Sequence, residues 1–205
     1  MSNAIPSPRR RRLAAAVATG VLFALGVPAA ASADCPSTTT TKAFKQFGDQ
    51  ANYSLVPAGA FESGTTGWSL TGASVASGNE SYKVHGSSDS HSLAVQPTGL
   101  AVSPSFCVSL ANPTFRFFAK QTSGSWATMV VKLRWKDSRG AVNTTTLGSL
   151  NGTSSWQPSQ VLPLATSLPL WQSGQTLNVQ LIFDPEDYGG AWAIDDVYID
   201  PYARG

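Results

Sequence analysis

The sequence predicts an all-β fold, an antiparallel β-sandwich, because two of its features agree. Apolar and polar residues alternate with a period of two in several segments, as in strands with one buried face. Clusters of Gly, Ser, Asn and Pro separate these segments and supply turns, whereas apolar residues at helical spacing are nearly absent. In the clearest segment Met129, Val131, Leu133 and Trp135 alternate with Val130, Lys132, Arg134 and Lys136.

Further strands are expected on both sides of that segment. The same alternation is found in residues 115–118, 177–184 and 196–199, and shorter candidates are residues 68–70, 81–84, 92–95, 106–108 and 141–146. Many short strands in one domain predict a sandwich or jelly roll rather than alternating β and α units. One short helix is expected within residues 41–52, where Phe44 and Phe47 are spaced for one helical face, and residues 162–171 should form a covering loop.

The N-terminal residues 1–33 are typical of a signal peptide. Four arginines at positions 9–12 precede an apolar run over residues 13–27, and Ala31-Ser32-Ala33 fits an A-x-A cleavage pattern. The alternative, a transmembrane anchor, needs about 20 apolar residues, which is more than this run provides. We therefore expect a secreted protein, exported by the Sec or the Tat route, with no membrane span once the signal is removed.

The rest of the chain has the size and charge of one near-neutral domain. We expect an N-terminal extension over residues 34–54 and a β-sandwich domain over residues 55–205, present as a monomer. The chain has 14 Lys and Arg against 12 Asp and Glu, and four of the arginines leave with the signal. A nearly neutral domain argues against nucleic acid as a partner.

The chain holds two cysteines, Cys35 and Cys107. In a secreted protein an even pair of cysteines forms a disulfide more often than a metal site or a catalytic thiol. We expect a Cys35–Cys107 disulfide that joins the start of the mature chain to the sandwich. Because the loop it closes is long, the bond should stabilise the fold by about 4 kcal/mol.

Two motifs at opposite ends of the predicted domain indicate a more specific fold. Residues 59–64 read Gly-Ala-Phe-Glu-Ser-Gly and are followed by Gly67-Trp68, and residues 192–201 read Trp-Ala-Ile-Asp-Asp-Val-Tyr-Ile-Asp-Pro. These motifs resemble the opening and closing strands of galactose-binding-like jelly rolls, which include several families of carbohydrate-binding modules. The chain is also similar to a group of actinobacterial secreted proteins that share an N-terminal Cys, a strand like residues 113–119 and the same ending. Both resemblances bear on the fold more than on the role.

The jelly-roll resemblance also implies a structural Ca²⁺ ion. In such modules the opening glutamate and an aspartate of the closing strand often hold calcium, whose preferred ligands are carboxylate and carbonyl oxygens. The matching residues are Glu62 and Asp195, with Asp196 as a second candidate, and strand alternation turns Asp195 toward the core. The alternative is that Arg116, Lys83 or backbone N–H groups satisfy these acids without a metal.

Carbohydrate binding by such a fold implies aromatic stacking platforms beside polar side chains. Tyr188, Trp126 and Trp156 lie in or beside predicted loops and are the candidate platforms. A polar sheet face that carries Arg116 and Arg134 is a second candidate surface. Each feature also has a structural explanation, because aromatic residues cap sandwich edges and exposed strand faces are commonly charged.

Catalytic motifs do not accompany these features, since the chain lacks G-x-S-x-G, H-E-x-x-H and a phosphate-binding glycine loop. We expect a non-catalytic secreted β-sandwich that binds polysaccharide, a cell-surface glycan or another extracellular polymer. The alternative is a structural or protein-interaction domain of the cell envelope or spore surface without a small-molecule site. A third hypothesis is a hydrolase that depends on His85 or Glu186.

Overall fold

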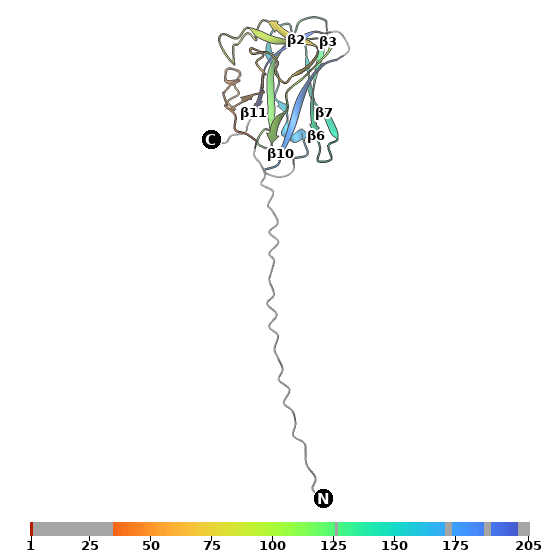
Figure 1. Cartoon of the computed structure of the whole chain (residues 1–205). Helices are drawn as coiled ribbons and strands as arrows, with labels where there is room; N and C mark the ends of the chain where they lie inside the picture. The colour runs from red at the N-terminus through yellow and green to blue at the C-terminus, as the bar shows by residue number, and fades with distance from the viewer. Residues whose placement is uncertain (2–34, 126, 171–173, 187–189, 201–205) are drawn as a thin grey trace. The chain divides into compact units, whose positions relative to one another are not determined.

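The structure is a computed structural model, and it describes most of the chain after the predicted signal (Figure 1). The chain divides into two units, Met1–Ala31 and Ser32–Gly205, and the β fold belongs to the second. Within the described ranges, no helix is long and apolar enough to cross a membrane. The described residues are Met1, 35–125, 127–170, 174–186 and 190–200.

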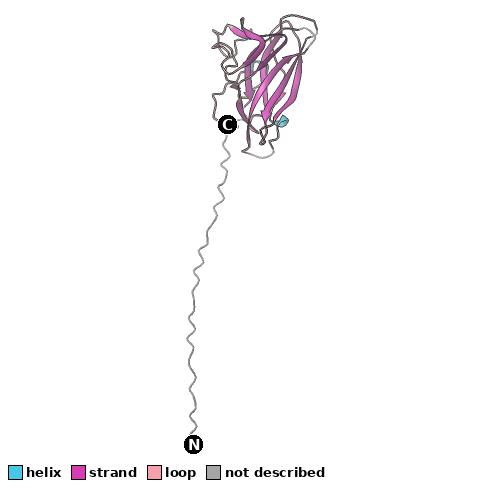
Figure 2. Cartoon of the chain, turned by 45° about the vertical axis from the view of Figure 1, so that its right-hand side comes forward, coloured by secondary structure: helices cyan, strands magenta, loops and turns pink. Residues whose placement is uncertain are grey.

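Strands account for nearly all of the regular structure (Figure 2). The short helix expected near the mature N-terminus is a single 3-10 turn, η1 (Lys45–Phe47), and a second such turn is η2 (Ala165–Ser167). The strands are β1 (Ser54–Leu55), β2 (Ser69–Ser77), β3 (His91–Val102), β4 (Phe106–Ser109), β5 (Thr114–Gln121), β6 (Thr128–Lys136), β7 (Val142–Asn151), β8 (Gln157–Pro158), β9 (Leu162–Pro163), β10 (Thr176–Pro185) and β11 (Trp192–Asp200).

All strand pairs are antiparallel, and together they form one sheet that curls into two layers. The order along the main path is β7-β6-β10-β3-β11-β5-β8. Strand β3 belongs to both layers, because its first residues pair with β11 and its last two pair with β10. The antiparallel sandwich predicted from the sequence is therefore confirmed.

The bend of β3 depends on a short segment in its middle. Strand β2 follows the bend on the outer edge, and its register with β3 shifts between Thr71 and Ala73. Opposite this shift, Thr98 has a φ of 61° and Gly99 lies against the backbone of Gly72. A side chain on Gly99 would meet two backbone oxygens at 2.7 and 2.8 Å, so a residue without Cβ is required there.

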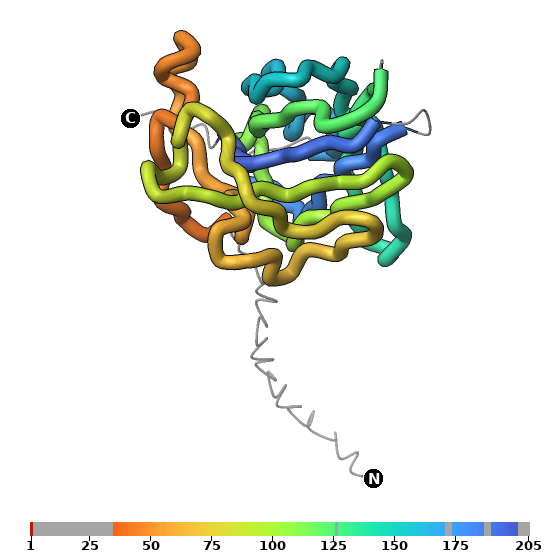
Figure 3. Tube along the Cα trace, turned by 90° about the horizontal axis from the view of Figure 1, so that it is seen from above, coloured from red at the N-terminus to blue at the C-terminus, as the bar shows by residue number. Residues whose placement is uncertain are grey.

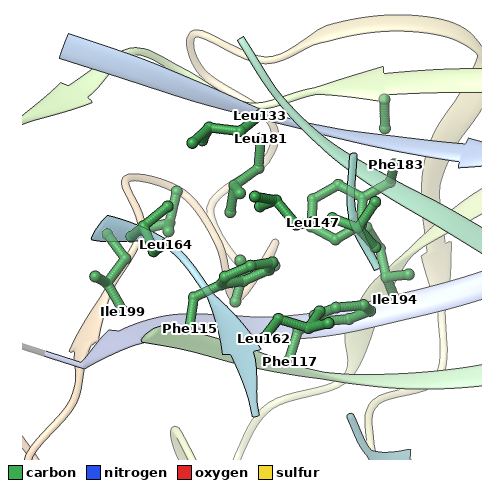
Figure 4. Packing of buried hydrophobic residues seen from close by; sticks show 14 of the residues in the cluster. Phe115, Phe117, Leu133, Leu147, Leu162, Leu164, Leu181, Phe183, Ile194 and Ile199 are labelled. Carbon is green, nitrogen blue, oxygen red and sulfur yellow. The ribbon is translucent and has the colours of Figure 1, made fainter. Parts of the chain in front are cut away.

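The main hydrophobic core lies between the two layers (Figure 4). Phe117 of β5 and Phe183 of β10 meet edge to face across it, with ring centroids 5.0 Å apart. The inward alternation predicted for β6 and β10 is largely confirmed, since Met129, Leu133, Val179 and Leu181 are fully buried and Lys132 and Arg134 are not. Two residues of β6 depart from it: Val130 on the outer face is buried, and Trp135 on the inner face is only partly buried. The residues expected inside were Met129, Leu133, Val179, Leu181, Val197 and Ile199, and all of them belong to this core.

A second apolar cluster covers the outer face of β5 and β11. Phe44 and Tyr53 of the N-terminal segment pack there against Phe118 and Tyr198, and Phe44 stacks on Phe118 with centroids 5.4 Å apart. Figure 3 shows this segment, in orange, lying along one side of the sandwich. The prediction that β5 and β11 are half-buried is therefore wrong, because residues of both faces are covered.

Two further predictions can be compared with the fold. The Cys35–Cys107 disulfide is present, with Cα atoms 5.4 Å apart, and it joins the start of the described chain to β4. The strand predicted over residues 81–84 is wrong, since this segment forms turns. Its backbone N–H groups donate to carboxylates instead of to a neighbouring strand, which is the physical reason for the difference.

Candidate functional site

The closing strand β11 contains a β-bulge that changes the direction of two acidic side chains. The pairing of β11 with β5 shifts register between Asp195 and Tyr198, and Asp196 has a φ of 48° in the left-handed region. Core residues are Ile194 before the bulge and Val197 after it, so the inward face changes parity there. The expectation that unbroken alternation turns Asp195 toward the main core is therefore wrong.

Both carboxylates instead contact the segment between β2 and β3. Asp195 Oδ2 accepts a hydrogen bond of 2.9 Å from the N–H of Glu80, and Asp196 Oδ2 accepts one of 3.1 Å from the N–H of His85. Asp195 Oδ1 accepts another from the N–H of Asp196. Neither aspartate is exposed to solvent. Consecutive carboxylates on one face are possible only because the bulge adds a residue.

The facing segment contributes two more buried acids and an imidazole. Glu80 is completely buried and accepts from the N–H groups of Tyr82 and Val84. Asp89 is 6% exposed, and its Oδ2 lies 2.7 Å from His85 Nδ1. The residues that approach Asp196 are thus His85 and Asp89, and one ligand atom of each of the three lies within 4.8 Å of the others.

The cluster carries more negative charge than the surrounding side chains balance. Burial, followed by the neighbouring charge of Asp196, raises the pKa of Asp195 to about 9. Burial, followed by the charge of Glu80, raises the pKa of Asp196 to about 7. Among the described residues, no Lys or Arg forms an ion pair with Glu80, Asp89, Asp195 or Asp196. A group of this kind favours a bound cation or retained protons.

Glu62, the other acid implied by the resemblance, binds elsewhere. Its Oε1 accepts from the N–H groups of Ser90 and His91, and its Oε2 lies 3.1 Å from His91 Nδ1. Burial alone would raise the pKa of Glu62, but these hydrogen bonds outweigh burial and lower the pKa below its usual range. Glu62 and Asp195 thus have different hydrogen-bond partners, and no contact between the two is found among the described residues. Calcium binding by the protein remains a prediction.

Sequence reasoning did not connect the β2–β3 segment with the closing strand. It singled out Asp195 and Asp196 through the resemblance, and His85 only as a residue of the hydrolase hypothesis. Glu80 was missed completely. The signal available in the sequence was the density of Glu, His and Asp between β2 and β3, in an otherwise weakly charged stretch. That pattern does not identify Asp196, the partner of His85, which is 111 residues away.

A second candidate site is a hollow on the outer face of the β6–β10 layer. We call it the polar hollow; its volume is about 810 Å³, within the range of small-molecule sites. It lies where β6 ends and β7, β10 and β4 begin, on the polar sheet face expected from the sequence. The residues that line it are Ser105, Arg134, Trp135, Lys136, Val142, Thr176, Leu177, Asn178 and Gln180.

The polar hollow combines hydrogen-bonding groups with positive charge. Arg134 donates to Gln180 Oε1 through Nε at 3.2 Å and Nη2 at 2.9 Å, and Gln180 donates to the backbone oxygen of Ser103. This chain of bonds holds both side chains in place and uses two of the five N–H donors of the guanidinium. Arg134 and Lys136 are cationic, and the described residues of the lining include no Asp or Glu.

Two of the predicted ligand-binding residues have structural contacts. Arg116 is 9% exposed; its Nε and Nη2 donate to the backbone oxygen of Ser159, and its Nη1 donates to Asp49. Trp156 is 7% exposed, packs in the second apolar cluster and has the Lys120 ammonium 4.9 Å from its ring centroid. Ligand binding by either residue remains a prediction, and neither lines the polar hollow.

The two other predicted platforms cannot be placed. Tyr188 and Trp126 lie outside the described residues. Of the three predicted ligand-binding residues that the structure describes, Arg134 lies in the polar hollow. Trp135 borders the hollow but has the inward parity of β6 and packs partly against the core, as its alternation predicted.

Comparison with known proteins supports the fold. No protein-family model matches the chain, and no curated protein matches it. The CBM22-1–GH10 modules of Clostridium thermocellum endo-1,4-beta-D-xylanase 10B, solved with xylohexaose, match over 71% of this chain and 28% of theirs, with a TM-score of 0.52 and 15% identity. This likeness shows a shared jelly-roll fold, and this chain spans much less than the length of that protein.

Two smaller structures match with lower TM-scores. The CBM22-1 xylan-binding domain of Paenibacillus barcinonensis Xyn10C has a TM-score of 0.49 and 16% identity, with 71% of this chain and 93% of that domain covered. TmCBM61 in complex with beta-1,4-galactotriose has a TM-score of 0.42 and 14% identity, with 71% and 96% covered.

Proposed function

We propose that this chain is an exported, non-catalytic β-sandwich that binds carbohydrate in the polar hollow. The observation that carries the proposal is the hollow itself, where Arg134, Asn178 and Gln180 lie side by side on the outer face of β6 and β10. Adjacent amide and guanidinium donors in a concave site can bind the hydroxyls of a sugar.

The charge of the hollow favours a particular class of glycan. Arg134 and Lys136 supply two cations, and no carboxylate lies among the described lining residues. A guanidinium pairs well with a planar carboxylate, because two parallel N–H groups match its two oxygens. We therefore propose that the preferred ligand is an acidic polysaccharide that bears uronate groups. Neutral xylan is the comparison ligand, because the xylanase modules with this fold were solved with xylohexaose.

Titration calorimetry with polygalacturonate, glucuronoxylan and neutral xylan tests this proposal. The protein should bind at least one acidic glycan, and Arg134→Ala and Asn178→Ala should each weaken binding about 10- to 100-fold, since a hydrogen bond to a charged group contributes about 1.5–3 kcal/mol. Ser149→Ala changes an exposed residue of β7 outside the hollow and should bind like the unchanged protein.

Three outcomes would contradict the proposal. Unchanged affinity in both hollow variants would exclude the hollow as the binding site. Preference for neutral xylan would exclude the acidic class. Absence of glycan binding, together with reproducible capture of one protein partner, would favour the structural or protein-interaction alternative.

Export is the second part of the proposal. Residues 1–33 have the pattern of a signal peptide, and the Cys35–Cys107 disulfide is of the kind that forms in oxidising compartments. Recovery of the protein from the culture medium with Asp34 as its first residue is the expected result of N-terminal sequencing.

A further inference from the structure

The buried acidic cluster is separate from the polar hollow and has no part in the proposed sugar binding. We propose that His85, Asp89 and Asp196 bind one divalent transition-metal ion of the zinc type. This site differs from the Glu62–Asp195 pair that the jelly-roll resemblance implies, both in its residues and in the presence of an imidazole.

The geometry of the three side chains supports a shared metal ion. One ligand atom from each lies within 4.8 Å of the others. Zinc binds imidazole nitrogen and carboxylate oxygen at about 2.0–2.2 Å, so the ligand atoms around one ion stand about 3.5 Å apart. Asp196 is held in place by the bulge of β11.

A buried oxygen of Asp196 without a hydrogen-bond partner also supports a bound cation. Asp196 is completely buried, and its Oδ1 has no hydrogen-bond partner within the described part of the chain. Burying a carboxylate oxygen without a partner is costly, and a cation next to it would remove that cost. Unlike Asp196, the neighbouring acids Glu80 and Asp195 use both of their oxygens as acceptors of backbone N–H groups.

The charge near the cluster, its ligand types and its exposure favour zinc over calcium and allow the ion to enter. The buried carboxylate of Glu80 lies close enough to act on Asp196 electrostatically, and its charge increases the attraction for a dication. Imidazole with carboxylates suits zinc and similar ions, whereas calcium prefers oxygen ligands throughout. The His85 side chain is 40% exposed, so an ion can reach the cluster from solvent and a water molecule can complete its coordination.

Titration calorimetry with zinc chloride on chelator-treated protein tests this proposal. One zinc ion should bind per chain, and saturating zinc should raise the melting temperature by several degrees through linkage. His85→Gln should weaken zinc binding at least 100-fold while the protein stays folded, because this side chain is partly exposed. His91→Gln is the matched control, since it removes a second imidazole of the same segment that pairs with Glu62 instead.

Each of the other outcomes would overturn the assignment. Failure of folded protein to bind zinc would exclude the site. Loss of binding in His91→Gln but not in His85→Gln would move the metal to Glu62. An equal melting-temperature rise with calcium, unaffected by His85→Gln, would exclude imidazole ligation.

With Co²⁺ in place of zinc, visible absorption bands should appear in the unchanged protein and disappear in Asp196→Asn.

Discussion

Single residues of the N-terminal segment connect it to the sandwich through one partly buried carboxylate, that of Asp49. Asp49 accepts hydrogen bonds from the hydroxyl of Tyr53 at 2.7 Å, from Arg116 Nη1 at 3.0 Å and from the N–H of Ala51 at 3.1 Å. Arg116 in turn lies over the ring of Phe44. These contacts join the segment before β1 to β5 by polar bonds as well as by apolar packing.

Stability should depend on pH through Asp49. Burial alone would raise the pKa of this carboxyl, but the bonds from Tyr53, Ala51 and Arg116 lower it below its usual range. A carboxyl with a lower pKa in the folded state stabilises the fold above its unfolded pKa of about 4, and this contribution is lost as the pH falls through the folded value.

Asp49→Asn should therefore lower the free energy of unfolding by about 1–2 kcal/mol at pH 7, because three donors lose an ionised acceptor. The difference from the unchanged protein should shrink between about pH 5 and pH 2, where Asp49 takes up a proton. Urea denaturation at several pH values measures it. Tyr53→Phe removes one donor and should give a smaller loss, and a difference that stays constant down to pH 2 would contradict the role given to Asp49.

At the scale of elements, the bend of β3 decides how the two layers meet. The strand passes from β11 to β10 within a few residues, and the backbone of Gly99 lies against the backbone of Gly72 on β2. The bulge in β11 is a second irregularity: it turns two carboxylates toward the β2–β3 segment. Both irregularities place side chains that straight strands would place elsewhere.

Gly99→Ala should destabilise the protein by about 1–3 kcal/mol, since the new Cβ would overlap backbone oxygens that cannot move separately from the sheet. Chemical denaturation with matched m-values measures the change. Thr98→Gly is the control at the adjacent position: relief of its positive φ and the added freedom of the unfolded chain nearly cancel, so its stability should change by less than about 1 kcal/mol. A larger loss in the control than in Gly99→Ala would contradict this explanation of the bend.

For the whole molecule, the disulfide limits the freedom of the unfolded chain. Cys35 and Cys107 are separated by 72 positions, so the bond closes a loop that contains the N-terminal segment, β1, β2 and β3. Through this closure the start of the described chain remains next to β4 and β10.

Replacing both cysteines with alanine should lower the free energy of unfolding by about 4 kcal/mol, because a loop of this length loses much of its entropy when it is closed. Guanidinium denaturation measures the loss, and the circular dichroism of the folded state should not change. A reductant should lower the stability of the unchanged protein to that of the double variant and should have no effect on the variant itself. Equal stabilities before reduction would contradict the predicted contribution.

Much of the fold could be predicted from local patterns. The alternation in β6 and β10 identified their inward residues, and the single pair of cysteines identified the disulfide. Of the candidate sites, the polar face that contains Arg134 was predicted. Strand β2 was recognised only at its beginning, because its small polar residues lie on an exposed edge and its hydrogen bonds come from β3.

The sequence alone determined the strand alternation and the cysteine pairing, since each depends on residue types and short spacings. The tertiary structure decided which faces are covered, where alternation breaks, and that the segment after β2 meets β11. Glu80 and Asp195 are 115 positions apart, and their contact depends on a bulge in β11. A local pattern reports the periodicity of a strand, but the partners of a buried charge are set by how distant segments pack.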